Sequence, residues 1–224
     1  MSERRRVLGI VLAAAIAGAC GGPERGVVSN YFGALAQGDN QTLTSFATVR
    51  LEEKVDGWEI VGTSEEQLSP ATLPDLVAMR AEIKAEYDTN KTAANEYYNE
   101  NADAVDDIRD IRSAAKENEE EPKIPRRLTK VAEEWQVFTD KDLEMKRAVA
   151  EADEEVERES RVTKLSDGAT ADIENQSGQI RSLNVDLVLT IGGQPKNYTM
   201  TLRRYDLDGG SGRSRWVVAA LDPK

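Results

Sequence analysis

The sequence contains no histidine, a single cysteine and few aromatic residues, which make up 5% of the chain. Without histidine it lacks the side chain that most often acts as a general base at neutral pH and as a metal ligand. One cysteine can form neither an internal disulfide nor a cysteine-rich metal site. The sequence also has no nucleophile–base pair, phosphate-binding loop or zinc-ligand spacing. We therefore predict a non-enzymatic protein with no catalytic residues, no cofactor and no bound metal.

Basic residues are also scarce, because 29 Lys and Arg stand against 41 Asp and Glu, for a formal net charge of −12. Nucleic-acid binding needs clustered Lys and Arg to meet the phosphates, so no nucleic-acid partner is expected. Anionic lipid head groups would repel such a chain. Any attachment to a membrane must therefore come from a hydrophobic feature.

That feature is at the N-terminus. Three arginines, at positions 4–6, precede the apolar run Val7–Ala19. The run is shorter than the roughly 20 residues that a membrane-spanning helix needs, and it has the form of a secretory signal. It ends Ile-Ala-Gly-Ala before Cys20, which Gly21 follows. These residues resemble the lipobox of bacterial lipoproteins; the alternative is an ordinary signal peptide with an incidental cysteine.

The resemblance implies cleavage before Cys20 and attachment of diacylglycerol to its sulfur. Residues 1–19 would be the signal peptide, and residues 20–26 the lipidated cysteine with a short tether. Two or more acyl chains, such as palmitate, anchor a protein durably, whereas one does not. We therefore expect a lipid-anchored protein of the bacterial cell envelope. Since Gly21 and not Asp follows the cysteine, the outer membrane, on its periplasmic side, is favoured for a Gram-negative host.

Residues 72–161 carry apolar side chains at alternating spacings of three and four, which is the seam of a coiled coil. One seam runs from Leu76 to Ala115 and the second from Leu128 to Val156, with Pro122 and Pro125 between them. A short connection favours antiparallel neighbours. We predict a hairpin of two helices, each about 50 to 65 Å long at about 1.5 Å per residue.

Four polar residues interrupt these seams: Arg80, Asn90, Asn101 and Asp142. Polar seam residues in coiled coils commonly fix the register of the helices. They could also lie where the hairpin meets solvent, or form a polar contact site for a partner helix.

The remaining residues predict an α+β domain. Residues 24–37 and a second short helix capped by Asp39 have amphipathic patterns. A strand is expected around Trp58 and Ile60, followed by a loop over residues 64–73. After Val162 the pattern alternates, which predicts an antiparallel meander of strands at 171–176, 180–191, 196–207 and 214–221. A single sheet needs helices across its apolar face, and the N-terminal helices are the candidates.

Two segments resemble the cystatin-like, nuclear transport factor 2-like superfamily. The first is the helical pattern from Val27 to Asp39, with Tyr31, Phe32 and Gly38, and the second is the ending Arg215–Leu221. The resemblance implies a curved antiparallel sheet around N-terminal helices. Residues 27–71 and 162–224 would form this domain, and residues 72–161 would be the helical hairpin inserted into it.

Three features suggest sites, but each has a simpler interpretation. The segment from Asp206 to Gly212 has the start of a calcium loop without its distal Glu, so a hairpin turn is favoured. The acidic runs Glu117–Glu121 and Glu151–Glu159 could collect cations but are typical of a solvated helix face. The tryptophans could line a ligand pocket, although large aromatic residues are more often part of a core: Trp58, Trp135 and Trp216.

The sequence therefore predicts an envelope lipoprotein that acts as an interaction or scaffold module, with the hairpin binding a protein partner or a second copy of the chain. The alternative is a small-ligand binding module with a pocket between the sheet and the helices. A third alternative is an enzyme of the isomerase or dehydratase type found among the proteins it resembles, but the absence of histidine argues against it.

Overall fold

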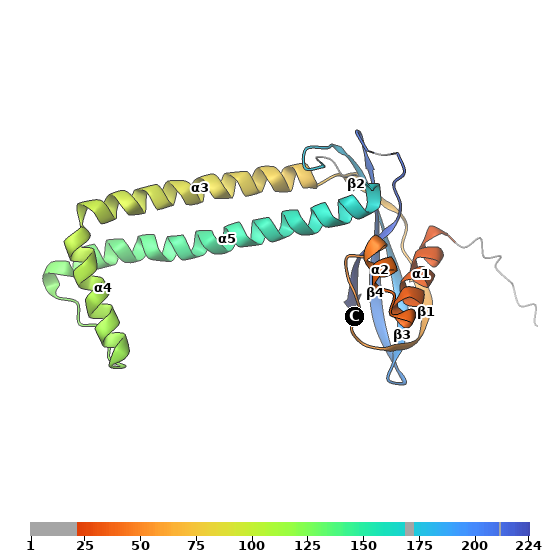
Figure 1. The fold of residues 1–224 in the computed structure, drawn as a ribbon, viewed down its shortest axis with the longest axis horizontal. Coiled ribbons are helices and arrows are strands. Elements are labelled where there is room, and N and C mark those ends of the chain that lie inside the picture. The colour runs from red at the N-terminus through yellow and green to blue at the C-terminus, as the bar shows by residue number, and fades with distance from the viewer. Residues whose placement is uncertain (1–21, 169–172, 211) are drawn as a thin grey trace, which may run out of the picture.

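The computed structural model describes residues 22–168, 173–210 and 212–224. Within these ranges the chain forms five α-helices and an antiparallel sheet of five strands (Figure 1). The predicted α+β class is confirmed at this level. Cys20 lies outside the described residues.

The N-terminal helices are α1 (Pro23–Gln37) and α2 (Asn40–Phe46). Proline suits the first turn of α1, where its missing N–H costs no hydrogen bond. The helix therefore begins at Pro23, and residues 23–26 are helical instead of forming the end of the predicted tether. Asp39 caps α2 as predicted, because its side chain accepts a 3.0 Å hydrogen bond from the Thr42 amide.

The sheet has the strand order β1-β3-β4-β5, and β2 also pairs with β3. Gly192 and Gly193, both with positive φ, form the tight turn between the two longest strands, β3 and β4. The strands are β1 (Val55–Thr63), β2 (Gln67–Pro70), β3 (Gly178–Ile191), β4 (Gln194–Leu207) and β5 (Val217–Pro223).

The two faces of the sheet are covered by different helices. One face packs on α1 and α2 through a buried apolar set: Leu183, Val185, Leu187, Leu189, Tyr198, Met200, Leu202 and Val218. Side chains alternate across a strand, so Ile180 and Tyr205 lie on the opposite face. Together with Val217 they pack against Val162 near the end of α5 (Thr129–Asp167). Figure 1 shows α5 meeting the sheet on the side away from α1.

Three helices, and not the predicted two, make up the inserted region. α3 (Leu73–Glu100) and α5 run side by side and antiparallel, extending away from the sheet (Figure 1). Lys84 bonds to Asp153 across the pair at 2.8 Å. α4 (Ala102–Glu117) then crosses the far end at a steep angle and is followed by a 3-10 turn, Arg126–Leu128.

The prediction of one continuous helix from Leu76 to Ala115 is therefore wrong. The chain leaves the helical conformation at Asn101, which has φ −124° and ψ 22°. Asn101 ends α3 by donating a 3.0 Å hydrogen bond from its side chain to the Tyr97 carbonyl. Asparagine favours such local bonds to the backbone over helix interiors.

Two further predictions for the sheet need correction. The described part of the predicted strand 171–176, residues 173–176, contains a turn and no strand, and Ile173 is buried against Leu73 and Val156. The predicted loop 64–73 contains strand β2, which extends the sheet beside the first half of β3. Its four residues are exposed, so they give no alternating apolar signal.

Candidate functional site

The far end of the hairpin forms a compact elbow, here defined as residues 97–138. Val105 and Ile108 of α4 are buried, and Ile108 packs against Leu128 and Ala132 at the start of α5. Burying an aliphatic side chain of this size contributes about 1.5 to 3 kcal/mol. This packing holds α4 across α5 and prevents it from continuing along the axis of α3.

Aromatic side chains line the inner corner of the elbow. Tyr97 stacks on Trp135 with ring centroids 6.4 Å apart, and it also contacts Phe138 at 5.2 Å. The Arg109 guanidinium lies over both Tyr98 and Trp135, at 5.0 and 5.3 Å from their ring centroids. Trp135 is therefore part of the elbow's own packing.

Tyr97 also forms a polar contact across the two helices. Its hydroxyl donates a 2.9 Å hydrogen bond to Glu134. Partial burial, together with this carboxylate, raises the pKa of Tyr97 to about 12. The hydroxyl therefore stays protonated, and remains a donor, over the physiological pH range.

A groove runs from the elbow along the outer face of α5, the face that points away from α3. The part at the elbow has a volume of about 400 Å³, and its lining combines apolar and charged side chains: Arg112, Ile124, Thr129, Ala132, Glu133, Gln136, Val137 and Asp140. A second hollow of about 420 Å³ continues it with the residues Asp140, Leu143, Glu144, Arg147, Ala148 and Glu151. Val137 and Leu143 are 66% and 51% exposed, which is unusual for aliphatic residues on a helix that already has a packed face.

The four polar seam residues have different surroundings. Arg80 pairs with Asp153 of α5 at 3.9 Å and with Glu174, in the segment before β3, at 3.4 Å. Asp142 pairs with Lys146 on its own helix. Asn101 ends α3, as described above. Asn90 is only 7% exposed, and its side-chain amide nitrogen has no hydrogen-bond partner among the described residues.

Where the hairpin meets the sheet, a buried carboxylate joins three chain segments. Glu159 of α5 is 7% exposed. It accepts hydrogen bonds from the Tyr205 hydroxyl at 2.7 Å, the Arg203 guanidinium at 2.9 Å and the Thr72 hydroxyl at 3.1 Å. Burial, and then the nearby carboxylate, raise the pKa of Tyr205 well above its ordinary value. The interpretation of Glu151–Glu159 as a wholly solvated face is therefore wrong at its last residue.

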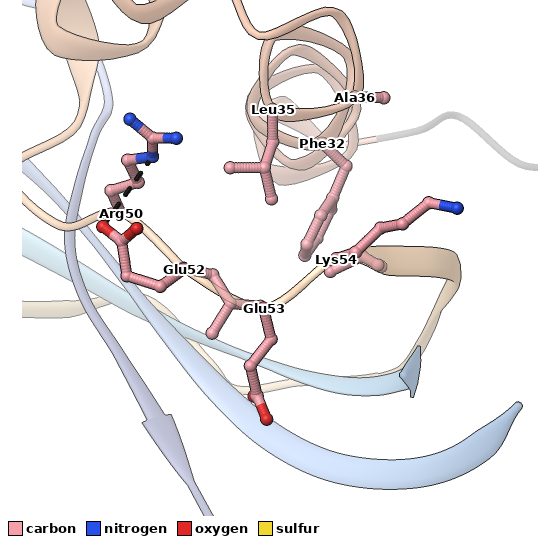
Figure 2. A pocket seen from close by; sticks show the side chains of 9 residues that line it. Phe32, Leu35, Ala36, Arg50, Glu52, Glu53 and Lys54 are labelled. Atoms are coloured by element: carbon pink, nitrogen blue, oxygen red, sulfur yellow. Dashed lines mark ion pairs between the residues drawn. The ribbon is translucent and has the colours of Figure 1, made fainter. Parts of the chain in front are cut away.

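A hollow of about 260 Å³ lies beside α1, between that helix and the segment that leads into β1. Figure 2 shows Phe32 and Leu35 pointing from α1 toward this segment, while the side chain of Glu53 points away from the helix. Glu53 accepts a 2.9 Å hydrogen bond from Lys196, which is the main cause of its lowered pKa. The volume is below the roughly 300 to 1,000 Å³ typical of ligand pockets.

The space between α1 and the sheet is occupied by side chains. Val28 and Tyr31 of α1 are completely buried, as are Val185, Leu189 and Met200 of the sheet. The hollow in Figure 2 is therefore at the margin of this core and not inside it. Trp216 packs at the core's edge, whereas Trp58 is 36% exposed and stacks on Phe32 with the ring centroids 5.5 Å apart.

In the segment from Asp206 to Gly212, the first acidic residue, Asp206, is held in place by protein groups. Asp206 accepts hydrogen bonds from Ser214 at 2.6 Å, Arg181 at 2.8 Å and Arg204 at 3.1 Å. The Ser214 hydrogen bond is the largest cause of its lowered pKa, despite partial burial. Within the described residues, no group of three acidic or cysteine side chains is arranged to hold a metal ion.

The predicted lipidation residue, Cys20, is outside the described residues, so the geometry around it carries no argument. In the part of the chain that the structure describes, no helix is both long and apolar enough to span a bilayer. No protein-family model, curated protein or solved structure matches this chain significantly.

The sequence analysis missed Val137, Leu143 and Glu159 as residues of interest. Val137 and Leu143 are apolar residues that lie outside the seam formed by Trp135, Phe138 and their equivalents. Their position outside the seam indicates an exposed apolar face of the helix. Glu159 gave no such signal, because it is one of several acidic residues in a helical run. Its burial depends on where strand β4 lies.

Proposed function

We propose that this chain is a non-enzymatic envelope lipoprotein, anchored through Cys20, that presents a helical hairpin to a partner. The lipobox resemblance supports the anchor, and the low content of catalytic residue types supports the absence of enzymatic activity. In a Gram-negative host we place the protein on the periplasmic side of the outer membrane, because Gly21 follows the cysteine.

We further propose that the base of the molecule is a cystatin-like domain interrupted by a coiled-coil hairpin. The arrangement of α1 and α2 on one face of an antiparallel sheet supports the first part. The close antiparallel course of α3 and α5 supports the second. The hairpin is inserted between β2 and β3, two strands that pair with each other in the sheet.

One observation carries the functional proposal. The hairpin extends far from the sheet, α5 alone being about 58 Å long at about 1.5 Å per residue, and the exposed aliphatic residues Val137 and Leu143 lie toward its far end. Only the end of the rod next to the sheet shares buried clusters with the sheet domain, whereas the cluster at its far end contains hairpin residues alone. Its packed elbow and exposed apolar groove are features of a binding surface held at a distance from the anchor.

The proposal is tested by placing a photo-crosslinking amino acid at single exposed positions of the full chain in its host. The positions are Val137 and Leu143 on α5, Met79 on α3, and Val61 and Leu68 on the sheet domain. We expect partner proteins to be crosslinked to the amino acid at the hairpin positions. Adducts to the sheet positions alone, or to none of the five, would contradict a hairpin-based function.

The anchor has a separate test. Changing Cys20 to Ala should abolish labelling with radioactive palmitate and release the protein from the membrane fraction. Processing of the unchanged chain should also stop in globomycin, which inhibits the lipoprotein signal peptidase. Membrane association that survives the Cys20 change would show that the anchor lies elsewhere.

A second candidate function is binding of a small ligand in the hollow beside α1, whose volume of about 260 Å³ would limit the ligand to one smaller than those of typical pockets. Its apolar floor and charged rim suit a small amphipathic molecule. Changing Ala36 to Trp should fill the hollow, since Ala36 lines it. Native mass spectrometry of the membrane-extracted protein should then show a co-purified small molecule on the original chain and not on the Ala36→Trp variant.

A further inference from the structure

The hairpin carries most of the negative charge of the molecule. Residues 73–167 contain 26 Asp and Glu against 16 Lys and Arg, a formal net charge of −10, whereas the whole chain has −12. The charge is not cancelled locally on the outer face of α5. Glu133, Glu144 and Glu151 form no ion pair among the described residues, although all three line the groove.

The same face exposes two aliphatic side chains, one on each side of the groove. Val137 and Leu143 are six residues apart, which is about 9 Å along the helix and about 120° around its axis. Residues i and i+7 of another helix are about 10 Å apart and lie on one face. A helix lying in the groove between Val137 and Leu143 can therefore bring an apolar side chain to each of the two residues.

The charges around these two contacts decide the kind of partner. The groove is lined by four carboxylates, at positions 133, 140, 144 and 151, and by two guanidiniums, Arg112 and Arg147. A second copy would bring another hairpin of charge −10 against the first, and like charges oppose association. A basic partner instead gains from the same field, both in encounter rate and in specificity.

We propose that the outer face of α5, from Thr129 to Glu151, docks a basic amphipathic helix of a partner protein. The inference rests on the proposed function of the hairpin and names the class of its partner. Apolar residues of the partner helix cover Val137 and Leu143, and Lys or Arg beside them meet Glu133, Asp140 and Glu144. This is recognition of a helix in a groove, with its apolar anchors two turns apart.

The test uses the full chain in its host with the photo-crosslinking amino acid at position 137, followed by mass spectrometry of the crosslinked peptide. We expect a segment with a net positive charge and apolar residues repeating at three and four positions. Because surface charges are screened beyond about 10 Å at 0.1 M salt, the adduct yield from isolated membranes should fall several-fold between 50 and 500 mM NaCl.

Two charge-reversal variants provide a matched comparison. The double change Glu133→Lys and Asp140→Lys reverses the charge of two groove residues. The control, Glu82→Lys with Asp88→Lys, makes the same change of net charge at exposed positions on α3. The first should reduce the adduct at position 137 by about tenfold or more, which corresponds to losing about 1.4 kcal/mol of binding. The second should leave the yield within about twofold. Equal losses for both variants would overturn the proposal.

The remaining outcomes separate this inference from the proposed function. A crosslink to a second copy of the chain, or to a neutral or acidic segment, overturns the basic partner but keeps a hairpin that binds proteins. Adducts from Met79 without any from positions 137 and 143 overturn the groove alone. A hairpin that gives no adduct at any position overturns both.

Discussion

The hydrogen bond between Tyr205 and Glu159 is predicted to stabilise the packing of the hairpin on the sheet. Tyr205 is 1% exposed, and its hydroxyl donates to the carboxylate over 2.7 Å. A hydrogen bond to a charged group contributes about 1.5 to 3 kcal/mol, because its loss leaves a buried charge with one donor fewer. Changing Tyr205 to Phe removes this donor and keeps the ring that packs against Val162.

We expect Tyr205→Phe to lower the free energy of unfolding by about 2 kcal/mol. In a domain of this size the change corresponds to a fall in Tm of about 4 to 8 °C. The assay is urea denaturation of the purified mature protein, followed by far-ultraviolet circular dichroism. The matched control is Tyr97→Phe, which removes a similar hydroxyl–carboxylate bond of 2.9 Å at an exposed site.

Tyr97→Phe should lower the free energy of unfolding by less than about 0.5 kcal/mol, as surface substitutions usually do. A double-mutant cycle adding Glu159→Gln should give a coupling energy of about 1 to 2 kcal/mol, since the two side chains are in direct contact. The reasoning is refuted if Tyr205→Phe and Tyr97→Phe lose the same stability, or if the coupling is zero.

Three further predictions concern other parts of the molecule. Changing Asn90 to Leu should raise the free energy of unfolding by about 1 to 3 kcal/mol, because the buried amide nitrogen that has no hydrogen-bond partner among the described residues is removed. Exposed Asn95→Leu should change it by less than about 0.5 kcal/mol in the same urea titration. Changing Ile108 to Ala should cost about 2 to 5 kcal/mol and speed amide hydrogen exchange in α4, while exchange in β4 stays slow. The pKa of Asp206 is lowered in the folded state. Its contribution to stability is therefore present above the ordinary carboxyl pKa of about 4 and is lost as pH falls through the lower folded value. Asp206→Asn should accordingly lower Tm at pH 7 but hardly at pH 2.

The sequence predicted the strands and helices whose side chains follow a clear period. The alternation from Ile180 to Ile191 placed β3 almost to the residue, because one buried face imposes a period of two. Asp39 was identified as a cap from its residue type and position alone. These signals are local, so they do not depend on the rest of the fold.

The candidate site could be predicted only in part. The seam pattern pointed to a helical hairpin as the binding element, but it placed Tyr97 and Ile108 on one continuous helix. A helix that stops at Asn101 loses one turn of hydrogen bonds and gains the burial of Ile108 against Leu128 and Ala132. Whether the helix stops at Asn101 therefore depends on residues about 20 to 30 positions further along the chain, and a pattern of neighbouring residues does not contain that information.

The sequence by itself determined the composition-based properties of this protein: its acidic charge, its lack of histidine, its apolar N-terminal run ending at Cys20, and the amphipathic periods of its helices and strands. Only the tertiary structure decided which of these residues are exposed. Val137 and Leu143 remain uncovered because α3 packs on the other side of α5 and α4 packs only against its beginning, and Glu159 is buried because β4 brings Arg203 and Tyr205 to it. Period and charge are properties of neighbouring residues, whereas exposure depends on contacts between segments far apart in the chain.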